Sequence, residues 1–296
     1  MKILVAGANG QVGRELRSCG IRRGFEILAR DRAALDITDP RSVEKEINQP
    51  GVSLVVNAAG YTAVDQAELE PELAFSVNRD GAAYLAAACA KAGIPLIHIS
   101  TDYVFDGGKE GPYRETDPIS PLNVYGKSKA AGELAIKNLL REHIIVRTSW
   151  IYGVYGHNFV KTMLRLGREH DVLRVVDDQF GCPTSAGDLA ETILLIAAKW
   201  KDKGEIDWGI YHYCGTGVAS WHGFAEEIFS LASRHIALKV EKIEPISASL
   251  YPTHAKRPAN SVLDCSLLKE IFEIYPKPWP ESLARTLAVM FAVGES

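Results

Sequence analysis

The sequence predicts an α/β protein built on a doubly wound parallel sheet, with a smaller C-terminal substrate-binding lobe. Two observations support this fold class. Short, almost continuously apolar runs alternate with longer helical patterns through the first half of the chain, which is typical of parallel sheets covered by helices on both faces. A glycine-rich loop follows the first apolar run, at a turn from strand to helix.

The first half of the chain supplies the elements of the predicted sheet. Its apolar runs predict strands at residues 2–7, 25–30, 53–60, 95–101 and 143–149. The helical periodicity between them predicts helices near residues 11–22, 40–49, 71–92 and 123–141. Because crossovers between parallel strands are right-handed, this order places helices on both faces of one sheet.

The second half is less regular and predicts the smaller lobe. Helical patterns cover residues 158–169, 185–200 and 220–234, and Ser220 stands at the N-cap of the last one. Strands are expected within 172–184 and 209–217, and 252–272 is expected to be a loop followed by a helix. We therefore expect a first domain at 1–150 and mainly a second lobe at 151–296, with residues of about 186–216 returning to the first domain.

Composition disfavours several other classes of protein. The 296 residues are 47% hydrophobic and carry a net charge of −4, which suits a large core and gives no electrostatic case for nucleic-acid binding. No apolar run reaches the roughly 18 residues of a membrane span, and the first residues fit a strand better than a signal peptide. The five cysteines are scattered and have no zinc-binding spacing, so we expect reduced thiols and a cytoplasmic protein.

The glycine-rich loop GANGQVG places Gly7, Gly10 and Gly13 in a G-x-x-G-x-x-G pattern. Glycines here permit a tight turn and a close approach of the backbone to a pyrophosphate, and the helix N-terminus offers free N–H groups. A plain strand-to-helix turn is the alternative. The position of the loop after the first strand favours dinucleotide binding, which makes residues 1–150 the NAD(P)-binding domain of a Rossmann-type sheet.

The end of the second strand, ILARDR, bears on the choice between NADPH and NADH. An acidic residue there hydrogen-bonds the ribose 2′-hydroxyl, whereas an arginine accommodates a 2′-phosphate. Arg30 favours NADPH, with NADH still possible and a solvated charge cluster as the alternative. We expect Asp36 and Ile37 to flank the adenine. The third strand ends in small residues that let the cofactor lie close to the backbone, including Ala58, Ala59 and Gly60.

A proton-transfer set is expected where the fourth strand ends. That strand finishes at Ser100 and Thr101, and the segment NVYGKSKAAGE carries Tyr125 and Lys129 four residues apart on one side of a helix. A nearby ammonium and an oxidised nicotinamide favour the phenolate, so we expect the pKa of Tyr125 to lie below its usual value of about 10.

Tyr125 would then exchange a proton with a carbonyl or hydroxyl oxygen, and Thr101 would hydrogen-bond the same oxygen. Lys129 would also hold the nicotinamide ribose. The alternative is an ordinary tyrosine–lysine pair on a helix surface. The glycine loop and the hydroxyl at the end of the fourth strand favour the catalytic interpretation.

These features resemble the extended short-chain dehydrogenase/reductase family, and within it the reductases of nucleotide-linked 4-keto sugars. The similar segments cover almost the whole chain and lie at 57–68, 100–107, 121–133, 147–153, 158–166, 177–184, 220–228 and 255–264. The resemblance implies NAD(P)H-dependent reduction of the 4-keto group of dTDP-4-dehydro-β-L-rhamnose to dTDP-β-L-rhamnose, in dTDP-L-rhamnose biosynthesis.

Two alternatives stay open. One is a reductase of another nucleotide-linked 4-keto-6-deoxyhexose, and the other is a non-catalytic regulatory subunit with the same fold. The presence of Thr101, Tyr125 and Lys129 together argues against the regulatory subunit.

The resemblance also implies roles for individual residues. The cofactor phosphates would meet Gly10, Gln11 and Val12, and the groove would continue along Gly60, Tyr61, Thr62 and Ile99. The substrate would meet Val64 in the segment 62–65, Thr101, Asp102, Tyr103 and Trp150. It would also meet Asn158, Gln179 and Arg257, the last at its diphosphate. The alternatives are a core position for Trp150, a helix cap for Asn158, a solvated loop side chain for Gln179 and a surface charge for Arg257.

Some members of the family form a dimer that Mg²⁺ bridges through glutamates. Glu15 and Glu191 stand at possible matching positions, but the C-terminal segment MFAVGES offers no clear third ligand. Glutamates on a helix surface are the favoured alternative, which leaves Mg²⁺ undecided. We expect a small-molecule nucleotide sugar as binding partner, and a monomer or homodimer.

Overall fold

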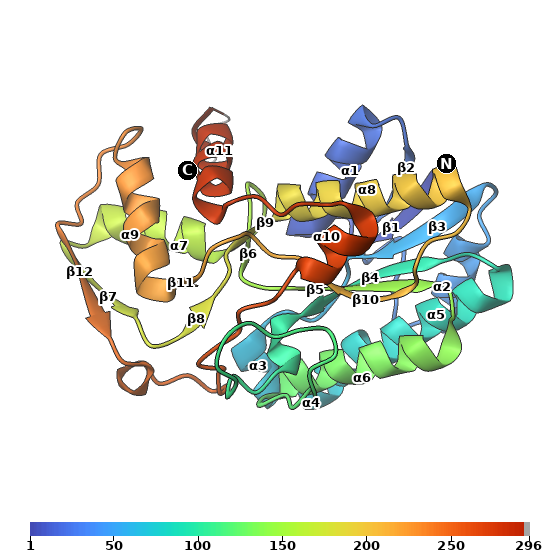
Figure 1. The fold of residues 1–296 in the computed structure, drawn as a ribbon, viewed down its shortest axis with the longest axis horizontal. Coiled ribbons are helices and arrows are strands. Elements are labelled where there is room, and N and C mark those ends of the chain that lie inside the picture. The colour runs from blue at the N-terminus through green and yellow to red at the C-terminus, as the bar shows by residue number, and fades with distance from the viewer. Residues whose placement is uncertain (293–296) are drawn as a thin grey trace.

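The computed structural model describes residues 1–292 and contains a six-stranded parallel sheet in the order β10-β5-β4-β3-β1-β2 (Figure 1). The strands are β1 (Lys2–Ala6), β2 (Glu26–Arg30), β3 (Val52–Asn57), β4 (Leu96–Thr101), β5 (His143–Thr148) and β10 (Gly209–His212). The chain winds from β1 to β2 in one direction and from β3 onward in the other, so the topological switch point lies between β1 and β3. The predicted doubly wound parallel sheet is confirmed.

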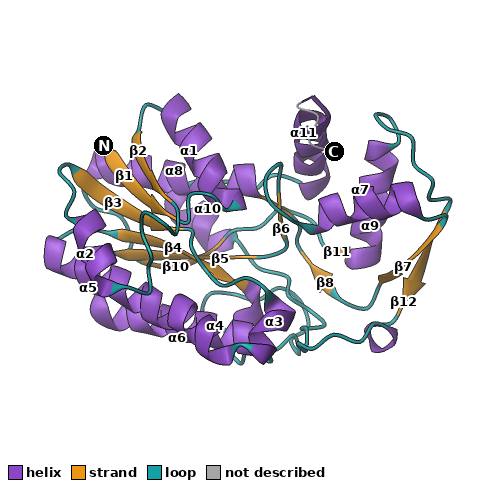
Figure 2. Cartoon of the chain, turned by 180° about the vertical axis from the view of Figure 1, so that it is seen from behind, coloured by secondary structure: helices purple, strands orange, loops and turns teal. Residues whose placement is uncertain are grey.

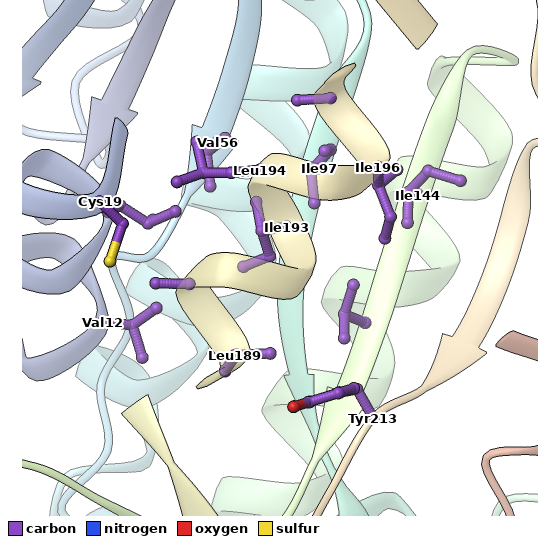
Figure 3. Packing of buried hydrophobic residues seen from close by; sticks show 14 of the residues in the cluster. Val12, Cys19, Val56, Ile97, Ile144, Leu189, Ile193, Leu194, Ile196 and Tyr213 are labelled. Carbon is purple, nitrogen blue, oxygen red and sulfur yellow. The ribbon is translucent and has the colours of Figure 1, made fainter. Parts of the chain in front are cut away.

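Helices cover both faces of the sheet (Figure 1). One face carries α1 (Gln11–Arg22), α8 (Ala186–Lys203) and α10 (Ser266–Phe272), and the other carries α2 (Pro40–Ile47), α5 (Gly81–Ala92) and α6 (Val124–Leu139). Figure 3 shows Ile193 and Ile196 of α8 beside Val56, Ile97 and Ile144 of the sheet, and all five side chains are buried. Burial on both faces explains why the strands read as almost continuous apolar runs.

One predicted helix is interrupted. The structure divides residues 71–92 into α4 (Pro71–Phe75), a π-helical turn η1 (Ser76–Asp80) and α5. In this turn the side chain of Asn78 donates to the Tyr61 carbonyl and the Ser128 hydroxyl, and it accepts from the Tyr61 N–H. These contacts between distant segments stabilise the wider turn. Helical periodicity does not predict such contacts, so it does not predict the interruption.

The second lobe lies beside the sheet and has its own core (Figure 2). Its helices are α7 (Phe159–Glu169), α9 (Trp221–Ala232) and α11 (Trp279–Ala292). Its strands pair as β7 (Val172–Val176) with β12 (Lys242–Ile246), β8 (Phe180–Gly181) with β11 (Ala219–Ser220), and β6 (Ile151–Tyr152) with β9 (Thr184–Ser185). Ser220 accepts from the Gly223 N–H, which confirms the predicted N-cap of α9.

Several short elements and one long helix are absent from the sequence prediction. They are α3 (Val64–Leu69), the 3₁₀ turns η2 (Asp102–Val104) and η3 (Ala248–Leu250), the strands β6, β11 and β12, and the helix α11. Among residues 1–292, no helix combines the length and the apolar character that crossing a membrane requires.

The chain returns from the second lobe to the sheet before it ends. After β9, helix α8 packs against α1, and β10 pairs with β5 at the edge of the sheet. Residues 219–246 then build part of the second lobe, α10 packs against β10, and α11 lies against α9. Each lobe is therefore assembled from segments that are far apart in the sequence.

A buried ion pair anchors α6 to the sheet. Arg147 of β5 donates through Nε and Nη2 to the carboxylate of Glu133, at 2.9 and 2.7 Å, and the side chains are 3% and 2% exposed. Ser100 of β4 donates to the same carboxylate at 2.5 Å. Glu133 lies one turn after Lys129 on the helix, so this pair also sets the position of the predicted catalytic residues.

Replacing Glu133 with glutamine leaves the Arg147 guanidinium buried without a counter-charge. We expect Glu133→Gln to lower the free energy of unfolding by about 3–5 kcal/mol, measured by urea denaturation. The matched control is Lys137→Gln on the exposed side of the same helix, which we expect to change stability by less than about 0.5 kcal/mol. Equal effects of the two variants would contradict the anchoring role of the pair.

Candidate active site

The glycine loop is packed too tightly to accept side chains. Gly7 has a φ of +78°, and a Cβ at this position would lie 2.5 Å from the backbone nitrogen of Ala59. A Cβ at Gly13 would lie 2.3 Å from the Gly7 carbonyl oxygen. Gly10 caps α1 without a side chain, so the first N–H groups of the helix face outward, where an anion can approach them.

A groove of about 470 Å³ runs beside this loop and the ends of β2 and β3, and we call it the cofactor groove. Several predicted cofactor residues line it: Gly7, Gly10, Asp36, Ile37, Ala58, Ala59, Gly60 and Tyr61. Others lie outside its lining, namely Gln11, Val12, Gly13, Arg30, Thr62, Ile99, Tyr125 and Lys129. Val12 is buried in the core, and the Gln11 side chain accepts a hydrogen bond from Asn158.

Arg30 does not fit the role predicted from the sequence. Its Nε donates to Glu46 Oε2 at 2.6 Å, and the carboxylate of Glu46 is 6% exposed. This partly buried ion pair directs Arg30 away from the groove. Arg32, two residues later, lines the groove with a side chain that is 78% exposed, and Asp31 lines the same groove.

The three predicted catalytic residues come from adjoining elements. Thr101 ends β4, Tyr125 lies in the first turn of α6, and Lys129 follows one turn later. Asn123 caps α6 by accepting from the Gly126 N–H at 2.7 Å. A Cβ on Gly126 would lie 2.2 Å from the Tyr103 carbonyl oxygen, so this glycine lets the start of α6 rest on the turn that follows β4. The structure thus brings Tyr125 next to Thr101.

Burial affects the pKa values of the tyrosine and the lysine in opposite directions. Loss of solvent raises the pKa of Tyr125 to about 12, and a hydrogen bond with Thr101 opposes this rise only in part. The lowered pKa expected from the neighbouring ammonium is wrong for the protein by itself, because desolvation is the larger effect. The same burial lowers the pKa of Lys129 to about 8. Tyr125 is therefore a phenol, able to donate a proton, throughout the neutral pH range.

Lys129 is enclosed by groups that the sequence analysis does not identify. Its Nζ donates to the Ile99 carbonyl at 2.6 Å and lies 3.3 Å from Nε2 of His98. Nδ1 of His98 lies 3.0 Å from the amide nitrogen of Asn57. His98 and Ser100 alternate with Ile97 and Ile99 along β4, and this polar alternation in a buried strand is the signal that could have found His98.

The predicted substrate residues form a second group at the same edge of the sheet. Burial raises the pKa of Asp102 to about 7, opposed in part by Ser261 and Thr101, and its Oδ2 has no hydrogen bond of good geometry among residues 1–292. The Tyr103 ring meets the Tyr125 ring edge-on, with centroids 5.8 Å apart. Arg257 donates to the Asp65 carboxylate at 2.5 Å, which joins the C-terminal loop to α3, the helix that begins at Val64.

Two further predicted substrate residues, Trp150 and Gln179, each lie just before a short strand of the second lobe. The Trp150 ring stacks on Trp221 at a centroid distance of 3.5 Å, and its backbone adopts a φ of +47°. Gln179 is partly buried just before β8, whose Phe180 N–H donates to the Ala259 carbonyl.

Asn158 behaves as the helix cap that the alternative interpretation describes. It accepts from the Lys161 N–H and donates to Gly153 and Gln11, so both of its side-chain N–H groups are engaged within the protein. A substrate role for Asn158 therefore finds no support in its hydrogen bonding.

The glutamates considered for Mg²⁺ do not form a fitting ligand set. Glu191 accepts from Arg23 at 2.6 Å, and burial raises the pKa of Glu15. No group of three or more acidic, histidine or cysteine side chains within residues 1–292 could hold a metal ion. Residues 293–296 of the segment considered for a third ligand lie outside the described part of the chain.

Comparisons with known proteins agree with this architecture. The family model RmlD substrate binding domain matches residues 1–291. The dTDP-4-dehydrorhamnose reductase of Aggregatibacter actinomycetemcomitans is 46% identical over 284 residues, which cover 95% of this chain and 97% of that protein.

Two solved structures are similar over almost their full length. The dTDP-4-dehydrorhamnose reductase of Clostridium acetobutylicum has a TM-score of 0.91 and 40% identity, and the match covers 98% of this chain and 99% of that one. The Bacillus anthracis enzyme of the same name, in complex with NADP, has a TM-score of 0.89 and 38% identity over 97% of this chain and 99% of its own. This chain therefore belongs to the dTDP-4-dehydrorhamnose reductase family, within the extended short-chain dehydrogenases/reductases.

Proposed function

We propose that this protein reduces the 4-keto group of dTDP-4-dehydro-β-L-rhamnose to give dTDP-β-L-rhamnose, with NADPH as the hydride donor. The observation that carries the proposal is the hydrogen bond between Tyr125 and Thr101, with Lys129 one helical turn after Tyr125 and its Nζ close to Gly60 of the cofactor groove. The name shared by relatives of 38–46% identity supports this choice of substrate. Five free cysteines, all buried thiols, fit a reducing compartment, and we propose the cytoplasm.

Tyr125 is the proposed proton donor. When bound, NADPH supplies the hydride to the carbonyl carbon, and the oxygen that gains negative charge must receive a proton. A phenol with a pKa of about 12 carries its proton at neutral pH and lies where Thr101 can hydrogen-bond the same oxygen. Asp102 and the Tyr103 N–H position the Thr101 hydroxyl, and its single proton would move from Asp102 to the substrate oxygen when the substrate binds.

Lys129 is proposed to hold the ribose and to support the phenolate that forms on Tyr125. A Cβ on Gly60 would lie 4.0 Å from Lys129 Nζ, so the amine reaches the edge of the cofactor groove. Asn78 accepts from the Tyr61 N–H and thereby holds the backbone next to Gly60. Sequence reasoning missed Asn78 because its role depends on the π-helical turn.

The substrate is proposed to lie over the edge formed by Asp102, Tyr103 and Trp150. The unpartnered Oδ2 of Asp102 would accept from a sugar hydroxyl. Arg257 carries a planar guanidinium that suits a diphosphate. Arg257 would leave its ion pair with Asp65 to bind the diphosphate, and the partly exposed Asp65 carboxylate would then be solvated by water. Gln179 and Val64 are proposed at the rim of the same site.

The decisive assay follows NADPH oxidation with dTDP-linked 4-keto-6-deoxy sugars of different configuration. We expect turnover with the 4-ketone of L-lyxo configuration. Turnover restricted to another configuration would replace the proposed substrate, and no turnover with any of these sugars would overturn the reductase function.

Tyr125→Phe removes the proposed proton donor and keeps the ring. We expect kcat to fall about 10²–10⁴-fold, since a positioned general acid contributes that much. NADPH affinity, measured by cofactor fluorescence, should stay unchanged because the glycine loop is intact. The matched control is Tyr275→Phe at an exposed tyrosine, which should keep full activity. Near-normal turnover by Tyr125→Phe would exclude Tyr125 as the donor.

Arg32 is proposed to contact the 2′-phosphate of NADPH. A charge-assisted hydrogen bond contributes about 1.5–3 kcal/mol, so Arg32→Ala should raise the KM for NADPH about 10- to 100-fold and leave the KM for NADH almost unchanged. Arg30→Ala is the matched control, because Arg30 faces Glu46 and should not alter the preference between the two cofactors. A larger loss of preference in Arg30→Ala than in Arg32→Ala would return the role to Arg30.

A further inference from the structure

A chain of buried polar side chains runs from β3 through β4 to α6. Asn57, His98 and Lys129 are 1%, 1% and 5% exposed. Asn57 Nδ2 lies 3.0 Å from His98 Nδ1, and His98 Nε2 lies 3.3 Å from Lys129 Nζ. Since the reaction proposed above places only Lys129 in the active site, the other two residues need an explanation.

The orientation of the Asn57 amide determines which imidazole nitrogen carries the proton. Asn57 Oδ1 accepts from the Ala59 N–H at 3.0 Å, so the NH₂ group must face His98. His98 Nδ1 is therefore an acceptor. A neutral imidazole carries one N–H, which must then be on Nε2, the nitrogen that faces Lys129.

This tautomer places a donor against the lysine. An ammonium group has three donors and no lone pair, so it cannot accept from His98 Nε2–H, whereas a neutral amine can. Lys129 still donates another hydrogen to the Ile99 carbonyl. We propose that Asn57 and His98 are positioning residues that hold the imidazole in its Nε2–H form and thereby favour the neutral amine of Lys129. This inference rests on the proposed reductase function for its kinetic consequence.

The charges around this group agree with the inference. Burial and the proximity of Lys129 hold the pKa of His98 well below its usual value, so the ring stays neutral. The titratable groups that face the pair are Glu133 on α6, which favours the ammonium, and His143 on β5, which disfavours a charged His98. Glu133 is already committed to Arg147, and Tyr125 on the same helix remains neutral near pH 7.

The consequence is a lysine that changes its charge close to physiological pH. Burial lowers the pKa of Lys129 to about 8, so the ammonium form is complete well below this pH and is lost as the pH rises through it. If the ammonium supports the phenolate, the reductase activity should fall on the alkaline side with the titration of Lys129.

The first test reads the tautomer directly. Two-bond ¹⁵N–¹H spectra of the ¹⁵N-histidine-labelled protein distinguish Nε2–H, Nδ1–H and imidazolium rings, and His98→Gln assigns the signal by its loss. We expect a neutral Nε2–H ring for His98 from pH 6 to 9. An Nδ1–H ring or an imidazolium at this position would overturn the inference, whether or not the protein is a reductase.

The second test reverses the donor at Asn57. Asn57→Asp keeps the acceptor for Ala59 and replaces the donor, so Nδ1 must take the proton and Nε2 becomes an acceptor for the ammonium. We expect the alkaline limb of the kcat profile to move up by about one pH unit or more. Asn78→Asp is the charge control, since it adds the same charge near Gly60 without touching His98, and the KM for NADPH is measured in both variants because Asn78 also holds the backbone beside Gly60.

The outcomes of this comparison are distinct. A larger shift in Asn57→Asp than in Asn78→Asp, with the His98 ring changed to Nδ1–H, supports the inference. Equal shifts would assign the effect to charge alone and overturn it. Wild-type protein without turnover on any dTDP-4-keto sugar would count against the proposed function, and the spectrum of His98 would then decide the inference by itself.

Discussion

The burial of α6 against β4 and β5 is the constraint on which the site depends. Glu133 joins the helix to Arg147 and Ser100, and one turn earlier Lys129 reaches Ile99 and His98. Because these contacts come from both neighbouring strands, sliding or rotation of α6 would break several buried hydrogen bonds at once. This packing sets the position of Tyr125 opposite Thr101. The two side chains are therefore held in place by the packed core beneath them.

Loss of solvent then prepares the two titrating groups for different tasks. A buried phenol is harder to ionise, whereas a buried ammonium loses its proton more easily, and both changes come from the same low-dielectric surroundings. A reductase needs a donor that keeps its proton until the hydride arrives. It also needs a cation whose charge can respond to the phenolate. The fold obtains both from one buried location.

The sequence predicts those parts of the structure that depend on local spacing. The spacing of Gly7, Gly10 and Gly13 predicts the loop, and the spacing of Tyr125 and Lys129 predicts that they share one side of a helix. Arg30 is different, since only the tertiary structure shows that Glu46 lies within reach of it. The π-helical turn at Asn78 and the contact of His98 with Lys129 likewise join residues that are 17 to 50 positions apart. Hydrophobic periodicity is judged over shorter stretches of sequence, so it does not reveal such pairs.

The return of α8 and β10 to the sheet has a consequence for how the protein can be divided. A fragment that stopped after β5 would lack the edge strand β10 and the helix that covers Val56, Ile97 and Ile144. It would expose an unpaired strand edge beside an uncovered apolar face, the combination that leads strands to join between molecules. A single crossover after β5 would therefore not exchange the substrate lobe alone, because it would also replace α8 and β10 of the sheet domain.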